Sequence, residues 1–333
     1  MRSPWTNPTI IRRPTIAVLS AAALLVACRD FPEATSPSRP QPDVLVAPPP
    51  CGVVTSNTNL SGDCMGPLVV GASGITVNLG GHAVTCGPVP NPPTASVGIE
   101  IFGQTNDHVT NGEVENCNLG IQISRGGSHE LSNLNVHNHF FAGIHLDRSS
   151  NNVIRNTVSS SNSDGVFLDI GAAFNKLDHL QIEQNSGTGI EIALGADNNV
   201  VTSSFLRRNA VAGIVMDGSN NTIDRSTNVT ESRVGIEVAA STGNTIRATK
   251  SFDNDFTGIL LMEDATNATI QSSDASNNGQ TGIQLLSAAT NNLIMSNKAF
   301  GNGSFDLEDD NPACDDNTWK SNQFGTAYPG CIS

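Results

Sequence analysis

A glycine followed by an aliphatic residue recurs every 22 to 24 residues through most of this chain of 333 residues. Three residues after each of these glycines stands a second apolar residue, as in Gly143-Ile144-His145-Leu146. The recurring glycines are Gly98, Gly120, Gly143, Gly165, Gly189, Gly213, Gly235, Gly258 and Gly282. A fixed period of this length is typical of solenoid proteins, because a single unit of this size cannot bury its own apolar face and must stack on its neighbours.

In most units the residues after the glycine alternate between apolar and polar, which is the period of a β-strand with one buried face. Branched aliphatic residues at the first apolar position suit a pleated strand better than a helix. No stretch after residue 50 carries a helical apolar stripe, which disfavours the helical repeats of similar length. The residues predicted to face the interior are Ile99, Ile101, Ile121, Ile123, Ile144, Leu146, Val166, Leu168, Ile190, Ile192, Ile214, Met216, Ile259, Leu261, Ile283 and Leu285.

An asparagine marks a second position in most units, two residues before an aliphatic or aromatic residue. These asparagines are Asn152, Asn175, Asn199, Asn221, Asn244, Asn292 and Asn317. Asp107 and His129 occupy the same position in earlier units, and Ala268 interrupts the series. Asparagines stacked one per coil can bond to one another and tolerate left-handed backbone at a bend. A row of ligands is the alternative, but we predict a structural ladder because such ladders satisfy buried bends.

A third apolar position shortly before the next glycine completes each unit with a third short strand. It is occupied by Val114, Val136, Val158, Ile182, Phe205 and Val229. The whole pattern resembles the right-handed parallel β-helix repeat family, which includes pectate-lyase-like enzymes, alginate epimerases and NosD-like periplasmic proteins, over roughly residues 66–325. The resemblance implies an all-β fold, a single-stranded right-handed parallel β-helix (solenoid) of about ten to twelve coils. It does not settle an activity, because the fold hosts many functions.

Residues 1–27 have the composition of a bacterial export signal. Three arginines precede an apolar run over residues 16–27, which is too short to remain as a membrane-spanning helix. The run ends in Leu25-Val26-Ala27-Cys28, which resembles a lipobox with Cys28 as the acylated residue, and an ordinary secretory signal is the alternative. We therefore expect an exported protein whose lipid anchor is its only membrane contact, on either the periplasmic side or the cell surface.

Residues 28–50 are rich in proline and lack periodicity, which predicts an extended tether before the coil of residues 51–333. Apart from Cys28 the chain has six cysteines, an even number that favours disulfides in an exported protein, although six cysteines allow 15 connectivities. Short sequence separations suggest Cys51–Cys64, Cys86–Cys117 and Cys314–Cys331. The first and last of these would staple the two ends of the coil, where open strand edges invite aggregation.

The chain is acidic, with a formal net charge of −14. This charge disfavours nucleic acid and anionic lipid as partners, and polyanionic polysaccharides too unless calcium bridges the two. Charged pairs on neighbouring coils are expected between Arg155 and Asp178, and between Asp224 and Arg247. Each exposed pair contributes only about 0–1 kcal/mol to stability.

The outward residues of the glycine-led strands gather acids in the middle of the coil. The candidate catalytic residues are Asp147, Asp169, Glu191 and Asp217, with His145 assisting. Carboxylates on adjacent coils would lie about 5 Å apart, near the separation that glycosidases use. Solvated acids that keep the coil soluble are the plain alternative. The last coils become apolar at Leu260, Met262 and Leu286, which predicts either a docking patch or a surface covered by the C-terminal cap.

Two metal sites are conceivable from the sequence. His137, His139 and His145 on neighbouring coils could bind copper, as the resemblance to NosD-like proteins suggests, and His145 with Asp147 and Asp169 could bind calcium. Isolated surface histidines are commoner than either site.

We rank three functions. The first is a non-catalytic, membrane-tethered β-helix that binds an envelope or extracellular polysaccharide, or another partner. It rests on the tether, on the uniform coils and on the lack of any string that matches the Asp-Pro-His-Asp motif of the epimerases or the motifs of the pectinases. The second is a polysaccharide lyase or glycoside hydrolase that uses the acids, and the third is a NosD-like metal-handling protein.

Overall fold

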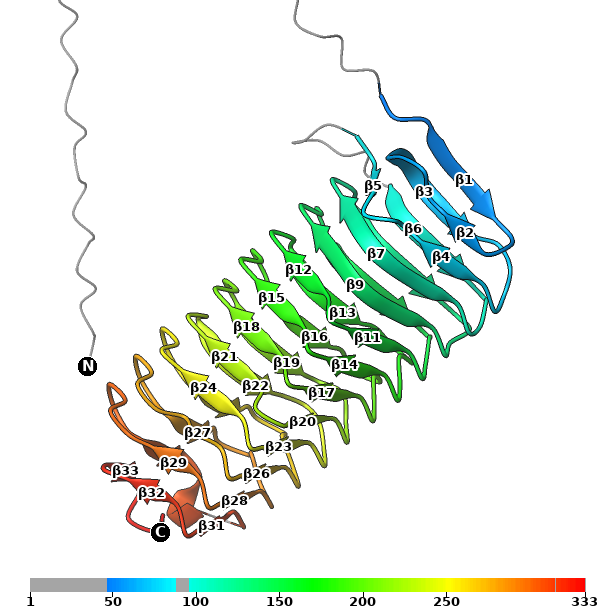
Figure 1. Cartoon of the computed structure of the whole chain (residues 1–333). Coiled ribbons are helices and arrows are strands. Elements are labelled where there is room, and N and C mark those ends of the chain that lie inside the picture. Colours follow the sequence, from blue (N-terminus) through cyan, green and yellow to red (C-terminus); the bar gives the residue numbers. More distant parts are fainter. Residues whose placement is uncertain (1–46, 88–95, 315, 333) are drawn as a thin grey trace, which may run out of the picture. The chain divides into compact units, whose positions relative to one another are not determined.

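The structure is a computed structural model that describes residues 47–87, 96–314 and 316–332. From β1 (Pro50–Val54) onward these residues form a parallel β-helix of about eleven turns, in which strands pair with the equivalent strands of neighbouring coils (Figure 1). The predicted export signal, Cys28 and the tether up to residue 46 lie outside the described residues. Within the described part of the chain, no helix is long and apolar enough to span a bilayer.

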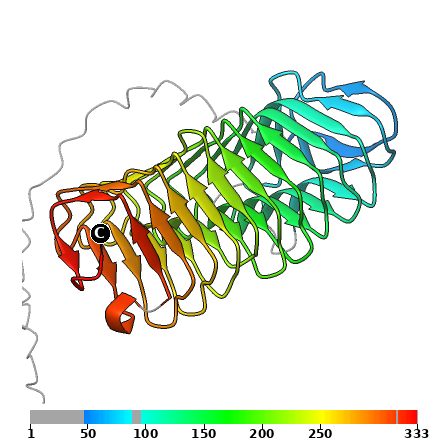
Figure 2. The same ribbon diagram turned by 90° about the horizontal axis from the view of Figure 1, so that it is seen from below.

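Most coils carry three short strands, so three parallel faces run along the solenoid (Figure 2). The first face contains the glycine-led strands: β1, β3 (Cys64–Val70), β6 (Val97–Phe102), β8 (Leu119–Ser124), β10 (Ala142–Asp147), β13 (Asp164–Leu168), β16 (Ile190–Ile192), β19 (Ala212–Met216), β22 (Val234–Val238), β25 (Ile259–Leu261), β27 (Ile283–Leu285), β30 (Leu307–Asp309) and β33 (Ala327–Tyr328).

The second face follows the asparagine positions. It contains β2 (Thr58–Asn59), β4 (Thr76–Asn78), β7 (His108–Glu115), β9 (Glu130–His137), β11 (Val153–Arg155), β14 (Lys176–Asp178), β17 (Val200–Thr202), β20 (Thr222–Asp224), β23 (Thr245–Arg247), β26 (Thr269–Gln271), β28 (Leu293–Met295) and β31 (Thr318–Lys320). The third face contains β5 (Ala83–Thr85), β12 (Val158–Ser160), β15 (Gln181–Glu183), β18 (Phe205–Arg207), β21 (Asn228–Thr230), β24 (Lys250–Phe252), β29 (Lys298–Ala299) and β32 (Gln323–Phe324). The long strands β7 and β9 lie in both faces.

The interior is filled by aliphatic side chains stacked in columns, and every first-face residue predicted to point inward is fully buried. The recurring glycines are needed because a side chain there would collide with the neighbouring bend. A Cβ on Gly189 would lie 2.5 Å from the carbonyl oxygen of Gly213 and 2.7 Å from Nδ2 of Asn209. The glycine period is therefore a packing requirement of the coil.

The predicted asparagines form a hydrogen-bonded ladder at the bend before the second face. The backbone N–H of Asn152 donates to Oδ1 of Asn175 at 2.9 Å, and the same bond repeats along the series until Ala268 interrupts it. The left-handed residue of the bend is the one before the ladder residue, such as Asn151 with φ 61°. His129 continues the ladder toward the N-terminus by donating its N–H to Asn152 at 3.0 Å.

Two further ladders, which were not predicted from the sequence, line the other bends. The first follows the third face and consists of His139, Asn162, Asn185, Asn209, Ser232, Asn254, Asn278 and Asn302. The second lies between the second and third faces and includes Ser204, Ser273, Asn297 and Asn322. On most coils, each of the three bends thus carries a polar side chain that accepts a hydrogen bond from a backbone N–H of the preceding coil.

Two predicted positions of the third strand are shifted by one residue. Val158 and Phe205 point outward, and the interior positions belong to Ser159 and Leu206, which pair with Ile182. Ser159 is tolerated in the interior because its hydroxyl donates to the carbonyl oxygen of Gly165 at 2.8 Å. The prediction placed Val158 in the interior because its side chain is apolar.

The three disulfides of the structure join Cys51 to Cys64, Cys86 to Cys117 and Cys314 to Cys331, the pairs expected from sequence separation. The last lies beside the short 3₁₀ turn η1 (Pro312–Cys314) in the C-terminal cap. There Asp309 accepts a hydrogen bond from Nε1 of Trp319 at 2.9 Å. Both ends of the described coil are thereby cross-linked.

One of the two predicted charged pairs forms. Arg247 binds Asp224 through Nε at 3.2 Å and through Nη2 at 2.5 Å. The prediction for Arg155 and Asp178 is wrong, although the two are register partners, because Arg155 turns to Glu130 on the preceding coil at 2.5 Å. Asp178 bonds instead to Lys176, His179 and Thr202.

Candidate functional site

The outer side of the first face carries side chains in columns whose register follows from the parallel pairing. His145 lies beside Phe167, Phe167 beside Glu191, and Glu191 beside Val215. The column continues through Glu237, Leu260 and Gln284. Each outward side chain therefore has fixed neighbours one coil away on both sides.

An aromatic cluster, formed by Phe141, His145 and Phe167, lies across the first two of these coils. The His145 and Phe167 rings stack at a centroid distance of 5.2 Å with an angle of 8° between their planes. Phe141 stands nearly perpendicular to both and is 40% exposed. The cluster thus presents an apolar aromatic surface to solvent in a chain that is otherwise poor in aromatic residues.

An acidic strip follows the aromatic cluster along the coil and consists of Asp164, Asp169, Glu191, Asp217 and Glu237. Burial raises the pKa of Glu191 above its ordinary value, and the carboxylates of Asp164, Asp217 and Asp169 raise it further. Burial also raises the pKa values of Asp164 and Asp217. For Glu237, burial is again the main cause of a raised pKa, and the Asp217 carboxylate adds to it. Glu191 therefore lies among mutually repelling carboxylates and is the residue of the strip best suited to hold a proton.

His145 connects the aromatic cluster to the acidic strip. Its Nε2 lies 3.4 Å from Oδ2 of Asp169, and its Nδ1 is buried without a hydrogen-bond partner. Asp147 does not join the strip, because both of its oxygens are bound by Arg148, at 2.9 Å from Nε and 2.8 Å from Nη2. Of the predicted catalytic residues, the structure thus groups His145, Asp169, Glu191 and Asp217 and leaves Asp147 neutralised by its neighbour.

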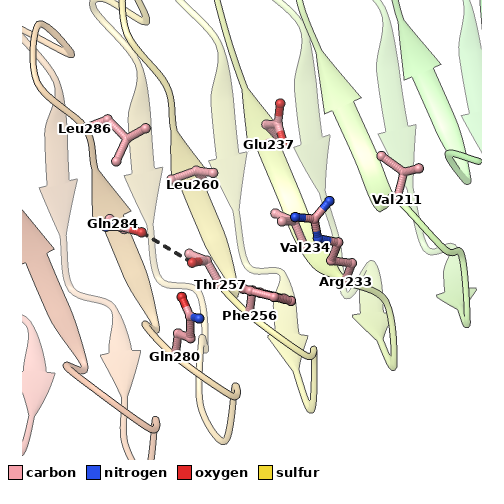
Figure 3. Close-up of a pocket in the computed structure, with 10 residues that line it drawn as sticks. All are labelled: Val211, Arg233, Val234, Glu237, Phe256, Thr257, Leu260, Gln280, Gln284 and Leu286. Carbon is pink, nitrogen blue, oxygen red and sulfur yellow. Dashed lines mark hydrogen bonds between the residues drawn. The ribbon is translucent and has the colours of Figure 1, made fainter. Parts of the chain in front are cut away.

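A groove of about 300 Å³ extends the strip toward the C-terminal coils. Figure 3 shows it lined by Val211, Arg233, Val234, Glu237, Phe256, Thr257, Leu260, Gln280, Gln284 and Leu286. Arg233 lies over the Phe256 ring at 5.1 Å from its centroid, and Thr257 donates its hydroxyl to Oε1 of Gln284 at 3.3 Å. Leu260 and Leu286 of the predicted apolar patch therefore line a groove, which Glu237 joins to the acidic strip.

The pattern that follows each glycine does not reveal four residues of this surface: Asp164, Phe141, Arg233 and Phe256. Three of them stand two residues before a recurring glycine, and Asp164 stands directly before Gly165. Phe141, Arg233 and Phe256 form a further outward column on the same face, and Asp164 lies one position nearer the glycine, in register with Ala142. Counting backward from each glycine would have found it.

The predicted three-histidine metal site does not form. His139 is buried, its Nδ1 accepts the backbone N–H of Cys117 at 3.2 Å, and its Nε2 lies 3.1 Å from the carbonyl oxygen of Val114. The nitrogens of His137 and His145 face carboxylates on different strands. In the described ranges, the one group of three or more potential ligands within mutual reach is Glu113, Glu115 and His137, so His145, Asp147 and Asp169 do not form the predicted calcium site either.

The chain matches the family model for the right-handed beta helix region over residues 56–206 and 208–331. No match is found among curated proteins. The match to the family model extends over most of the coil described above.

Several solved structures share the fold. The A-module of the mannuronan C-5 epimerase AlgE6 from Azotobacter vinelandii superposes with a TM-score of 0.63 at 13% identity, over 85% of this chain and 82% of that one. A double mutant of the periplasmic alginate epimerase AlgG gives 0.62 at 12% identity, over 83% and 70%. The Dettilon tailspike protein gives 0.61 at 15% identity, over 82% of this chain and 60% of that chain. At such identities the similarity shows the fold alone.

Proposed function

This chain belongs to the right-handed β-helix family, and we propose that it is a membrane-tethered protein that binds a polysaccharide along its first face. The observation that carries the proposal is one continuous surface on neighbouring coils: the aromatic cluster, the acidic strip and the groove. A polymer with repeating units suits a binding surface that itself repeats every coil.

The chemistry of this surface fits sugars. The exposed Phe141 ring offers the apolar contact that pyranose C–H groups make with aromatic side chains. The carboxylates of Asp169, Glu191 and Asp217 are hydrogen-bond acceptors for hydroxyl groups. In the groove, Gln280 and Gln284 add amide groups that both donate and accept.

The charge of the surface selects among polysaccharides. Most of the charged groups on this face are carboxylates, and a polyanion would raise the repulsion that already elevates the pKa of Glu191. We therefore expect uncharged or amine-bearing polysaccharides to bind, and polyuronates to bind weakly in the absence of calcium. The structural neighbours, which include alginate epimerases, support a polysaccharide as ligand without indicating its charge.

The purified protein can be tested by affinity electrophoresis and calorimetry against neutral glucans, xylans, chitosan and alginate. Phe141→Ala should weaken binding to the preferred polysaccharide by about tenfold, since loss of an aromatic contact costs about 1 kcal/mol or more. Phe205→Ala is the matched control, because Phe205 is similarly exposed on the third face. Equal binding by both variants, or binding to alginate alone, would contradict the proposal.

Hydrolysis of the bound polysaccharide is a second candidate function, favoured by the raised pKa of Glu191 between other carboxylates. In that reaction Glu191 would give its proton to the glycosidic oxygen, while Asp169 or Asp217 would take a proton from the water that attacks the anomeric carbon. The bond from the anomeric carbon to the leaving oxygen breaks as the bond to water forms.

Release of reducing ends during prolonged incubation separates the two functions. If the protein hydrolyses its ligand, Glu191→Gln should abolish product release and keep binding, because glutamine retains the shape of glutamate and cannot donate the acid proton. If no wild-type product appears on any polysaccharide that binds, the hydrolytic function is ruled out and the binding function stands.

A further inference from the structure

A cluster of two carboxylates and one imidazole lies on β7 and β9, away from the first face. Glu113 and Glu115 are two residues apart on β7, so their side chains project to the same side of the strand. His137 on β9 is the register partner of Glu115. One ligand atom from each of the three residues lies within 4.8 Å of the other two.

The charges of this cluster are not balanced by the chain. His137 Nε2 contacts Oε1 of Glu113, and in the described ranges no lysine or arginine pairs with Glu113 or Glu115. Elsewhere on the second and third faces, neighbouring coils supply a cation to an outward carboxylate, as Arg155 does for Glu130 and Arg207 for Glu183. The cluster therefore lacks the cation that comparable acidic positions have.

Polar neighbours hold two of the three side chains, those of Glu113 and His137, in place. Asn135 donates from Nδ2 to Oε1 of Glu113 at 3.2 Å, and Asn138 lies with its Nδ2 2.8 Å from Nδ1 of His137. For Nε2 to bind a metal, Nδ1 must carry the proton, and the Asn138 amide can accept that proton in a hydrogen bond when it is turned so that Oδ1 faces Nδ1. The His137 side chain is 17% exposed and that of Glu113 is 39% exposed, so an ion and water can reach them.

We propose that Glu113, Glu115 and His137 bind one divalent transition-metal ion, for which Zn²⁺ is the representative probe. Three ligands of the carboxylate and imidazole type, with water in the remaining position, form an open zinc-type site. Calcium fits poorly, because it takes six to eight oxygen ligands and this site offers an imidazole nitrogen. The ion would join two adjacent coils through rigid strands and neutralise both carboxylates.

The proposal is tested by calorimetric titration of the metal-free protein with ZnCl₂ and CaCl₂, and by melting curves with and without Zn²⁺. We expect one Zn²⁺ per chain, a higher melting temperature with Zn²⁺, and weaker binding of Ca²⁺. Glu115→Gln and His137→Gln should each weaken Zn²⁺ binding by at least about tenfold, because each removes one of only three protein ligands. The melting temperatures of the metal-free variants show whether the fold is retained.

His108→Gln is the matched control. His108 lies on the same strand as Glu113, and its Nδ1 is 3.7 Å from Oε2 of Glu130, but Arg155 already pairs with that carboxylate. Zn²⁺ affinity should therefore be unchanged in this variant. The proposal fails if the wild-type protein does not bind Zn²⁺, or if both ligand variants, when folded, bind it as tightly as the control does. Polysaccharide binding by the first face does not enter any of these measurements.

Discussion

Nδ1 of His139 accepts a hydrogen bond from the backbone N–H of Cys117 at 3.2 Å, in the position that an asparagine Oδ1 occupies on later coils. The imidazole is 3% exposed, and its own backbone N–H donates to Oδ1 of Asn162. His139 is therefore the first member of a backbone ladder. Because the ladder requires an acceptor at Nδ1, it requires a neutral ring in the tautomer that leaves Nδ1 unprotonated.

This position makes the coil sensitive to acid. Burial lowers the pKa of His139 from its ordinary 6.5 to about 4, so the unfolded chain binds more protons than the folded one between these two values. The stability contributed by the neutral ring is complete above pH 6.5 and is lost as the pH falls toward 4, by up to about 3 kcal/mol. Denaturant unfolding at pH 8, 6.5, 5 and 4 should show this loss.

His139→Asn should remove that part of the pH dependence, because asparagine supplies the same acceptor without titrating. The substitution leaves space beside Val114, so we expect a lower free energy of unfolding at pH 8 with no effect on the slope in acid. His108→Asn, at a half-exposed histidine, should keep the wild-type slope. A His139→Asn slope equal to that of wild type would show that other groups cause the acid sensitivity.

The acidic strip should respond to pH in the opposite sense. The folded-state pKa of Glu191 is raised above its ordinary 4.5, so its contribution to stability is complete below that value and is lost as the pH rises through the folded pKa. Glu191→Gln removes the repulsion and should raise the melting temperature at pH 7.5. At pH 4 the two proteins should melt alike, because Glu191 is then protonated in the folded state. An equal difference at both pH values would mean that the carboxylate charge is not the cause.

Membrane attachment should depend on Cys28. The preceding residues resemble a lipobox, so Cys28→Ser should abolish labelling by a radioactive fatty acid and move the protein from the membrane fraction to the soluble fraction of bacterial cells. Retention of both properties would contradict lipid anchoring through this cysteine. Replacing a cysteine of the coil such as Cys86 would test folding and not anchoring, because Cys86 forms a disulfide with Cys117.

The sequence predicts the fold well because its strongest signal comes directly from packing. Only glycine fits where a coil passes the next bend, as at Gly189, and each of these glycines sets the register of the two interior residues that follow. The first asparagine ladder was visible for the same reason, since its residues keep a constant distance from an inward aliphatic residue. Because each coil repeats the same packing and hydrogen-bond requirement, that requirement appears in the sequence as a period.

The remaining ladders and most of the site were harder to predict. The ladder along the third face changes residue type at His139 and Ser232, so its period is hidden although the hydrogen bonds are equivalent. Serine is typical of surface positions, and Ser159 can occupy the interior only because its hydroxyl donates a hydrogen bond to the carbonyl oxygen of Gly165. On the outer face no steric rule fixes the residue type, so whether Arg155 pairs forward or backward depends on side-chain geometry that periodicity does not encode.

The interruption at Ala268 offers the sharpest test of the ladder. The backbone N–H of Ala268 donates to Oδ1 of Asn292 at 2.8 Å, as a ladder residue should. Its methyl side chain, however, supplies no acceptor to Asn244 on the preceding coil. Ala268→Asn would place Oδ1 against the N–H of Asn244 and Nδ2 near the carbonyl oxygen of Ser241, by analogy with the bond from Asn292 to Ala265.

We expect Ala268→Asn to raise the free energy of unfolding by about 1 kcal/mol, the usual contribution of a hydrogen bond that satisfies a buried group. The reciprocal change Asn199→Ala should lower it by about 2 kcal/mol or more, because the N–H of Asn175 and the carbonyl oxygen of Ala172 would both lose their partners. Denaturant titration at pH 8 measures both. If Ala268→Asn destabilised the protein while Asn199→Ala behaved as expected, the bend at residue 268 would be too tight for a full ladder residue, and the interruption would be a steric requirement of that coil.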